Sequence, residues 1–95
     1  MKNLSEQEDG ALRRLIAEAK RGSEQGRRAA DFLLAWWNPG QCGGFDFTST
    51  WRCDESIAGD MVTVFALITK HKDYPAPAYQ EDFTDIVRQW RPELL

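Results

Sequence analysis

Residues 29–38 read Ala-Ala-Asp-Phe-Leu-Leu-Ala-Trp-Trp-Asn and form the densest apolar run in the chain. Apart from Asp31, no charged residue interrupts this run. On a helix, the adjacent Trp36 and Trp37 point about 100° apart, so they cannot share one contact. A helix that is apolar nearly all round has to be covered on several sides. The run therefore predicts a central helix around which the other segments wrap.

The central helix has clear boundaries, and a second helix precedes it. Ser23 is suited to cap its start, and the Asn-Pro-Gly at 38–40 stops it because proline cannot continue a helix. Upstream, Ser5 and Glu8 have the spacing of a capping box. The apolar stripe that follows predicts an amphipathic surface helix ending at Gly22.

Two further helices are predicted in the second half of the chain. Asp54 is suited to cap the first of them, and its wide apolar stripe indicates a core helix packed against the central one. That stripe consists of Ile57, Met61, Val64, Phe65 and Ile68. A stiff segment at 73–77, with two prolines, leads to the last helix, which Pro92 ends.

The segment at 38–53 is long for a connection in a small domain. It carries three glycines within five residues, which indicates a tightly folded loop, and Asp46 or Thr48 could cap a single helical turn in it. Its aromatic residues are expected to pack back on the core: Phe45, Phe47 and Trp51. Because ordered loops often carry function, this is where we expect a binding site.

The chain has 95 residues and a net charge of −3. Its length and the four predicted helices together indicate one all-α domain spanning 1–95. We expect a four-helix bundle with an ordered glycine–aromatic loop between its second and third helices. Residues 1–4 are expected to fray. The N-terminal stretch has no apolar core typical of a secretory signal, and no apolar run reaches the roughly 20 residues of a membrane span. We therefore expect a cytoplasmic protein without a membrane partner, in which Cys42 and Cys53 stay reduced.

Charge is unevenly distributed along the chain. Between residues 13 and 28, six basic residues face two acids, for a local charge of +4, whereas residues 46–95 carry nine acids and five bases. Two solvated helix faces would explain this pattern, and so would a docking surface for an acidic partner. The six basic residues are Arg13, Arg14, Lys20, Arg21, Arg27 and Arg28.

Residues 27–92 resemble a family of small uncharacterised proteins encoded on bacterial integrative conjugative elements and plasmids. The likeness rests on the run from Phe32 to Asn38 and the Cys-Gly-Gly-Phe-Asp at 42–46, and it continues through scattered later positions. Those positions are Trp51, Asp54, Ile57, Ala58, Asp60, Met61, Thr63, Val64, Tyr74, Pro75, Arg88, Trp90, Arg91 and Pro92. The resemblance implies cargo of mobile DNA and assigns no catalytic residue. Small cargo proteins of this kind often inhibit host defences, as anti-CRISPR proteins do, or assist transfer and maintenance.

Catalytic and metal chemistry find little support in the residue pattern. Cys42 and Cys53 lack zinc-knuckle spacing, and His71, the only histidine, lies about 25 Å from Cys53 if the intervening helix is straight. Acids near helix N-termini are explained by capping, and the Gly-Gly at 43–44 lacks the Lys-Ser/Thr of a phosphate loop. We expect no cofactor, no metal and no enzymatic activity.

Binding functions remain. Four tryptophans are a generous supply for so small a domain, and Trp, Tyr and Arg dominate interface hot spots. We therefore expect a non-enzymatic accessory protein of a mobile element that binds a host or element-encoded protein complex, in the manner of an anti-CRISPR inhibitor. The contacts would come from the six basic residues and from Phe45, Asp46, Phe47 and Trp51, and a homodimer would use the same aromatic patch. The alternative is a nucleic-acid-associated protein that uses the basic residues, against the net acidic charge.

Overall fold

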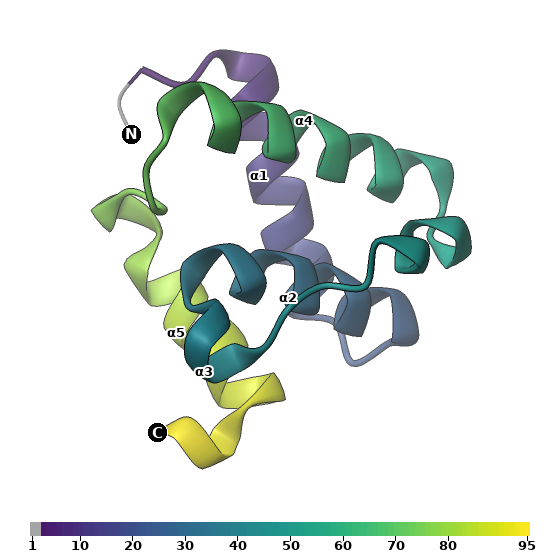
Figure 1. The fold of residues 1–95 in the computed structure, drawn as a ribbon, viewed down its shortest axis with the longest axis vertical. Coiled ribbons are helices and arrows are strands. Elements are labelled where there is room, and N and C mark those ends of the chain that lie inside the picture. Colours follow the sequence, from purple (N-terminus) through teal and green to yellow (C-terminus); the bar gives the residue numbers. More distant parts are fainter. Residues whose placement is uncertain (1–2) are drawn as a thin grey trace.

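A computed structural model describes residues 3–95 (Figure 1). Its α-helices are α1 (Glu6–Ala19), α2 (Glu24–Trp37), α3 (Pro39–Cys42), α4 (Glu55–His71) and α5 (Gln80–Trp90). Three 3-10 helices join them: η1 (Phe47–Arg52), η2 (Pro77–Tyr79) and η3 (Pro92–Leu94). Residues 3–95 contain no strand, which confirms the all-α class. The bundle itself is not confirmed, because α4 runs across α1 rather than alongside it (Figure 1).

Three of the four long helices begin directly after the residue predicted to cap them, and two of these residues form the cap hydrogen bond. The Ser5 hydroxyl accepts a hydrogen bond from the Glu8 amide at 3.1 Å, and the Glu8 carboxylate accepts one from the Ser5 amide at 2.9 Å, which completes the capping box of α1. The Ser23 hydroxyl accepts from the Gly26 amide at 3.0 Å and caps α2. Asp54 stands before α4, but its side chain makes no cap hydrogen bond. Local chemistry thus sets the start of α1 and α2.

The core is built around α1 and α2 together: α2 contacts α1, α3, α4 and α5, as expected of a central helix, and five residues of each helix are buried. α1 packs against α2, α4 and α5, and the main contact of α4 is with α1 rather than with α2. Small residues explain the close approach of α2 to α1, since Gly26 is buried and a Cβ there would lie 2.4 Å from the Arg21 carbonyl oxygen. Five buried side chains line α1: Ala11, Leu12, Leu15, Ile16 and Ala19.

The tryptophans of α2 lie at the edge of the core. Both are half-buried against the fully buried Phe83 of α5, with ring centroids 6.1 Å away for Trp36 and 6.3 Å away for Trp37. The indole N–H of Trp36 also donates to the Asp73 carbonyl oxygen at 2.9 Å. The two adjacent rings therefore contact the same residue, and the prediction that they cannot share one contact is wrong.

α4 buries a narrower face than its sequence predicts. Met61, Val64 and Leu67 are buried, whereas Phe65 is 54% exposed and Val62 is 69% exposed. Contact with α1 covers one side of α4 only, so the apolar residues on the other sides remain open to solvent.

Of the four residues expected to fray, the first two lie outside the described residues, and Leu4 packs against the core. Within residues 3–95, no helix has both the length and the apolar character needed to cross a bilayer.

Candidate protein-binding surface

The connection between α2 and α4 is held in place by local hydrogen bonds. The Asn38 side chain accepts from the Gln41 amide and caps the single turn of α3, and Gly43 has a φ of +92°, which favours glycine. Asp46 then accepts from the Thr48 amide at 2.9 Å and from the Thr48 hydroxyl at 2.8 Å, which confirms it as the cap of η1. These bonds hold the pKa of Asp46 below its usual value. The predicted glycine–aromatic loop is therefore an ordered segment.

Its aromatic residues divide into one that faces inward and two that face outward. Phe45 packs edge-on against Phe32 of α2, with ring centroids 5.2 Å apart and planes at 84°. Phe47 is 75% exposed and Trp51 is 81% exposed. The prediction that all three aromatic rings pack on the core is therefore right for Phe45 and wrong for the other two. The reason is that η1 is a short 3-10 helix with no buried residue of its own.

Two adjoining hollows lie beside these rings, between α2 and α4. One has a volume of about 450 Å³ and the other of about 310 Å³. Four aromatic side chains line both of them: Phe32, Phe45, Phe47 and Phe65. The larger hollow extends to Trp36 and Tyr74, and the smaller one to Met61 and Val62. We call these eight residues the aromatic groove; Trp51 follows Thr50 of η1, which also lines the smaller hollow.

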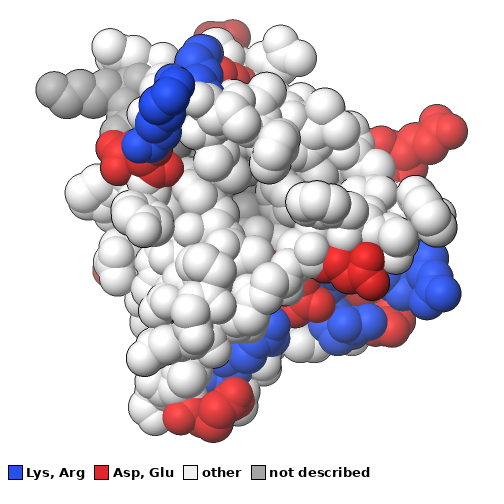
Figure 2. Space-filling view, in the orientation of Figure 1, with Lys and Arg blue, Asp and Glu red and all other residues white. Residues whose placement is uncertain are grey.

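The aromatic groove is free of charge. None of the residues that line its two hollows is acidic or basic. Figure 2 shows that the face between α2 and α4 is hollowed and uncharged in its middle, with charged side chains gathered along its edges. Large exposed apolar patches bounded by polar residues mark interaction sites on soluble domains. The geometry therefore favours an uncharged, apolar occupant.

Sequence reasoning found only part of this groove. It identified Phe45 and Phe47, together with Trp51 of η1, and did not identify the partners supplied by α4 and the segment after it, Phe65 and Tyr74. The signal available was the width of the apolar stripe on α4, which exceeds what one neighbour can cover. No local signal marks Tyr74, which is 65% exposed beside the groove.

Trp36 and Trp90 are half-buried and hold other parts of the fold through their indole N–H groups. The indole N–H of Trp90 donates to the Ala19 carbonyl oxygen at 2.6 Å, and this satisfies a carbonyl at the C-terminal end of α1. Trp36 is held by Asp73 in the same way. Trp51 is thus the most exposed of the four tryptophans.

The six basic residues predicted as a binding face are paired with acids. Arg14 donates two hydrogen bonds to Asp60 of α4, each of 2.9 Å, and Lys20 lies 2.7 Å from Asp82 of α5. The other four lie within 4.0 Å of acids three or four positions away in the sequence: Arg13 of Asp9, Arg21 of Glu18, Arg27 of Glu24 and Asp31, and Arg28 of Glu24. Folding thus brings acids from the second half of the chain onto the basic first half. None of the six lines the aromatic groove.

The thiols and the histidine do not come together as a site. Cys42 is buried and Cys53 is half-buried, and burial raises the pKa of both thiols, which opposes the thiolate needed for nucleophilic attack. The Cys53 thiol donates to the Ser49 carbonyl oxygen instead. Within residues 3–95, no group of three or more metal-binding side chains is close enough to share an ion.

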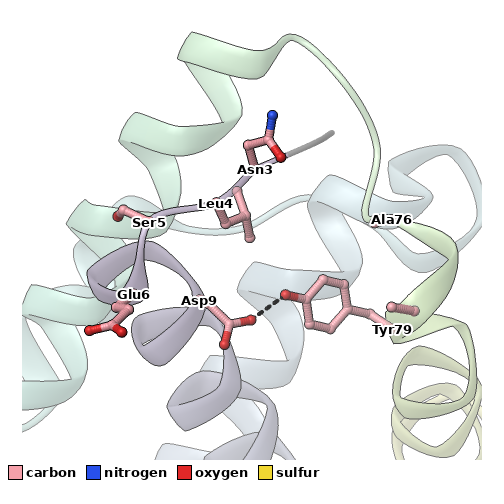
Figure 3. A pocket seen from close by; sticks show the side chains of 8 residues that line it. Asn3, Leu4, Ser5, Glu6, Asp9, Ala76 and Tyr79 are labelled. Carbon is pink, nitrogen blue, oxygen red and sulfur yellow. Dashed lines mark hydrogen bonds between the residues drawn. The ribbon is translucent and has the colours of Figure 1, made fainter.

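A further hollow of about 330 Å³ lies where the start of α1 meets η2 (Figure 3). The Tyr79 hydroxyl points at Asp9 across it and donates a hydrogen bond of 2.5 Å. Asp9 also accepts from Arg13, whose guanidinium lies 5.3 Å above the Tyr79 ring. Burial and the Asp9 hydrogen bond raise the pKa of Tyr79 to about 12, and the bonds from Tyr79 and Arg13 lower that of Asp9. The polar groups at this hollow are thus already satisfied by one another.

Comparison with known proteins identifies the family. The model of a family of unknown function, DUF7673, matches residues 9–91, so the chain belongs to this family. No curated protein and no solved structure matches the chain.

Proposed function

We propose that this member of the DUF7673 family is a non-enzymatic binding protein whose aromatic groove receives an apolar segment of a partner protein. The observation that carries the proposal is the exposure of Phe47 and Trp51, 75% and 81%, on an ordered loop beside an uncharged hollow. Burial of a large apolar side chain is worth about 1.5–3 kcal/mol, so a partner that covers both rings gains a substantial part of its affinity from them.

The fixed conformation of the loop supports a binding role for its exposed aromatic rings. The Asp46 cap and the inserted Phe45 ring fix η1 before any partner arrives. A surface that is already in its binding conformation loses little conformational entropy on association. Exposed aromatic rings on a fixed backbone are the usual composition of an interface hot spot.

The partner is expected to present apolar side chains and no buried charge. A charged group that entered the groove would lose its hydration and find no counter-charge among the lining residues. Exposed charged side chains at the two ends of η1, Asp46 and Arg52, would contribute to orientation and on-rate.

The biological setting of this binding is a second step of the proposal. The resemblance of residues 27–92 to proteins of mobile elements supports a role as element cargo, and the partner would then be a host or element-encoded protein complex. Occupation of a surface on a host defence complex, as anti-CRISPR proteins do, requires only a binding face of this kind. The alternative role with nucleic acid has weaker support, because the six basic residues are engaged in ion pairs.

Affinity purification with matched variants tests the proposal. The tagged protein is compared with a Phe47→Ser/Trp51→Ser variant and with Leu95→Ser, which removes an apolar side chain 67% exposed at the C-terminus and outside the groove. We expect one protein to co-purify from a bacterial lysate with the parent and with Leu95→Ser, and to be lost with the double variant. The purified partner should then bind with the same dependence in calorimetry.

Two results would contradict the proposal. One is a set of co-purifying proteins that is the same for all three forms. The other is recovery of nucleic acid alone, lost as salt rises, which would move the function to the basic residues.

A further inference from the structure

α4 carries an exposed apolar face that adjoins the aromatic groove and shares Val62 with it. Residues on the side opposite its buried residues are exposed, and they are Gly59, Val62, Ala66 and Thr69. We call these four residues the outer face of α4. At 100° per residue, the outer face is centred about 180° from the side that packs on α1, and Phe65 of the groove lies beside it on α4.

The spacing of the outer face is that of a helix-pairing seam. Its members follow one another at intervals of three, four and three residues, and Glu55 extends the series by four residues toward the start of α4. A repeat of alternating three and four residues lets a second helix pack along the whole seam at a shallow angle. The occupant predicted by this spacing is another helix.

Gly59 is not explained by the packing of the single chain. It lies inside α4, where glycine is one of the poorest helix formers, and it is exposed. A Cβ added there would meet no atom within 4 Å. A glycine and an alanine on a seam allow two helix backbones to approach closely, so Gly59 and Ala66 fit a helix–helix contact.

Charged residues at the two ends of the outer face indicate which helix would pack there and in which direction it would run. Glu55 is exposed at the N-terminal end, and Lys72 is exposed at the other, where its ammonium donates to the Thr69 carbonyl oxygen. No charged residue lies between them on the outer face. A surface with opposite charges at its ends and none in its middle is complementary to itself when reversed. Helix dipoles also favour the antiparallel arrangement.

We infer that the outer face of α4 pairs with the outer face of a second copy of this chain in an antiparallel homodimer. Val62 of each copy then lies opposite Ala66 of the other, Gly59 opposite Thr69, and Glu55 near Lys72. A parallel pair would set Glu55 against its own equivalent, which like-charge repulsion disfavours. The interface is isologous, because each copy uses the same residues.

The antiparallel symmetry has a consequence for the aromatic groove. The two-fold axis of such a pair is perpendicular to both helices and lies in the plane between them, so a flank of α4 and its symmetry copy face the same way. Both aromatic grooves would open on one side of the dimer. The inference goes beyond the proposed function, since apart from Val62 it concerns residues outside the aromatic groove and is tested without any partner protein.

The test measures the oligomeric state of the full chain by sedimentation equilibrium over a wide range of protein concentration. We expect a reversible equilibrium between a 10.9 kDa monomer and a species of twice that mass. Ala66→Arg should raise the dimer dissociation constant about tenfold or more, because it places two long charged side chains on the seam. The matched control is Ala17→Arg, which makes the same change at an exposed alanine of α1 and should leave the equilibrium unchanged.

Charge reversal tests the direction of pairing. Glu55→Lys alone and Lys72→Glu alone should each weaken the dimer severalfold, and the double reversal should restore it. Circular dichroism of every variant shows whether it is folded. Sedimentation as a monomer at all concentrations, or equal dissociation by Ala17→Arg, would overturn the dimer. Failure of the double reversal to restore association would overturn its antiparallel direction. Because Phe47 and Trp51 are unchanged in these variants, failure here is distinguishable from failure of the proposed function.

Discussion

The carboxylate of Asp31 accepts a hydrogen bond of 2.8 Å from Arg91, although sixty positions separate the two residues. Asp31 is the one charged residue in the apolar run of α2, and Arg91 is the C-cap of α5. The same guanidinium donates to the Cys42 carbonyl oxygen at 3.1 Å. One side chain thus joins the end of α5 to α2 and to the end of α3, which fixes the chain just before the aromatic loop.

The Arg91 contacts should contribute measurably to stability. Arg91→Ala removes a partly buried ion pair, leaves Asp31 with Arg27 alone and takes the Arg91 donor from the Cys42 carbonyl, so we expect the free energy of unfolding to fall by about 2 kcal/mol. The control is Arg88→Ala, which breaks an exposed pair with Asp85 and should cost about 0.5 kcal/mol or less. Urea denaturation followed by circular dichroism measures both. Equal losses for the two variants would show that Arg91 has no special role.

The pair of Tyr79 and Asp9 predicts how stability depends on pH. The folded-state pKa of Tyr79 is raised from 10.0 to about 12, so its contribution is complete below pH 10 and is lost as the pH rises toward 12. The pKa of Asp9 is lowered from 3.8, so its contribution is present above that pH and is lost on further acidification. We therefore expect the pair to stabilise the fold fully between pH 3.8 and pH 10.0, the ordinary pKa values of the two groups.

Alkaline titration of tyrosine absorbance measures the raised pKa of Tyr79. The difference between the parent and Tyr79→Phe should be a single group that ionises near pH 12. Tyr79→Phe should also remove the loss of stability between pH 10 and 12 that this group causes. If the difference spectrum titrates near pH 10 instead, the Asp9 contact does not persist in solution.

Gly26 should tolerate no side chain. A Cβ at this position would lie 2.4 Å from the Arg21 carbonyl oxygen and 2.7 Å from that of Glu18, and both are backbone atoms of the adjoining turn and helix. We expect Gly26→Ala to lower the free energy of unfolding by about 1–3 kcal/mol. Gly22→Ala in the same connection meets nothing within 4 Å and serves as the control. Thermal unfolding of both variants decides whether α1 and α2 approach as closely as described.

The tryptophans should separate into structural and binding residues. Trp90→Phe loses the hydrogen bond to the Ala19 carbonyl oxygen and should destabilise the fold by about 1–2 kcal/mol. Trp51→Phe changes a ring that is 81% exposed and should alter stability by no more than about 0.5 kcal/mol. Melting temperatures test both. A large loss from Trp51→Phe would mean that this ring serves the fold rather than a partner.

The sequence by itself determined the helices and their caps. The Ser5–Glu8 capping box, Ser23, the Asn-Pro-Gly after Trp37 and the Asp46 cap are all local, because each depends on side chains within a few residues of the backbone groups that they satisfy. The glycine–aromatic segment could also be recognised as ordered, since its turn residues and its cap lie together in the chain.

Only the tertiary structure decided that α4 packs mainly on α1, and where charge and aromatic rings gather. α1 and α2 approach closely because Gly26 is small, while the large Trp36 and Trp37 rings stay at the edge against Phe83. Asp60 and Asp82 neutralise Arg14 and Lys20 from helices far along the chain. The groove joins α2, η1 and α4 in the same way. These relationships depend on contacts between distant residues, and the pattern of a single helix does not record which neighbour will cover which of its faces.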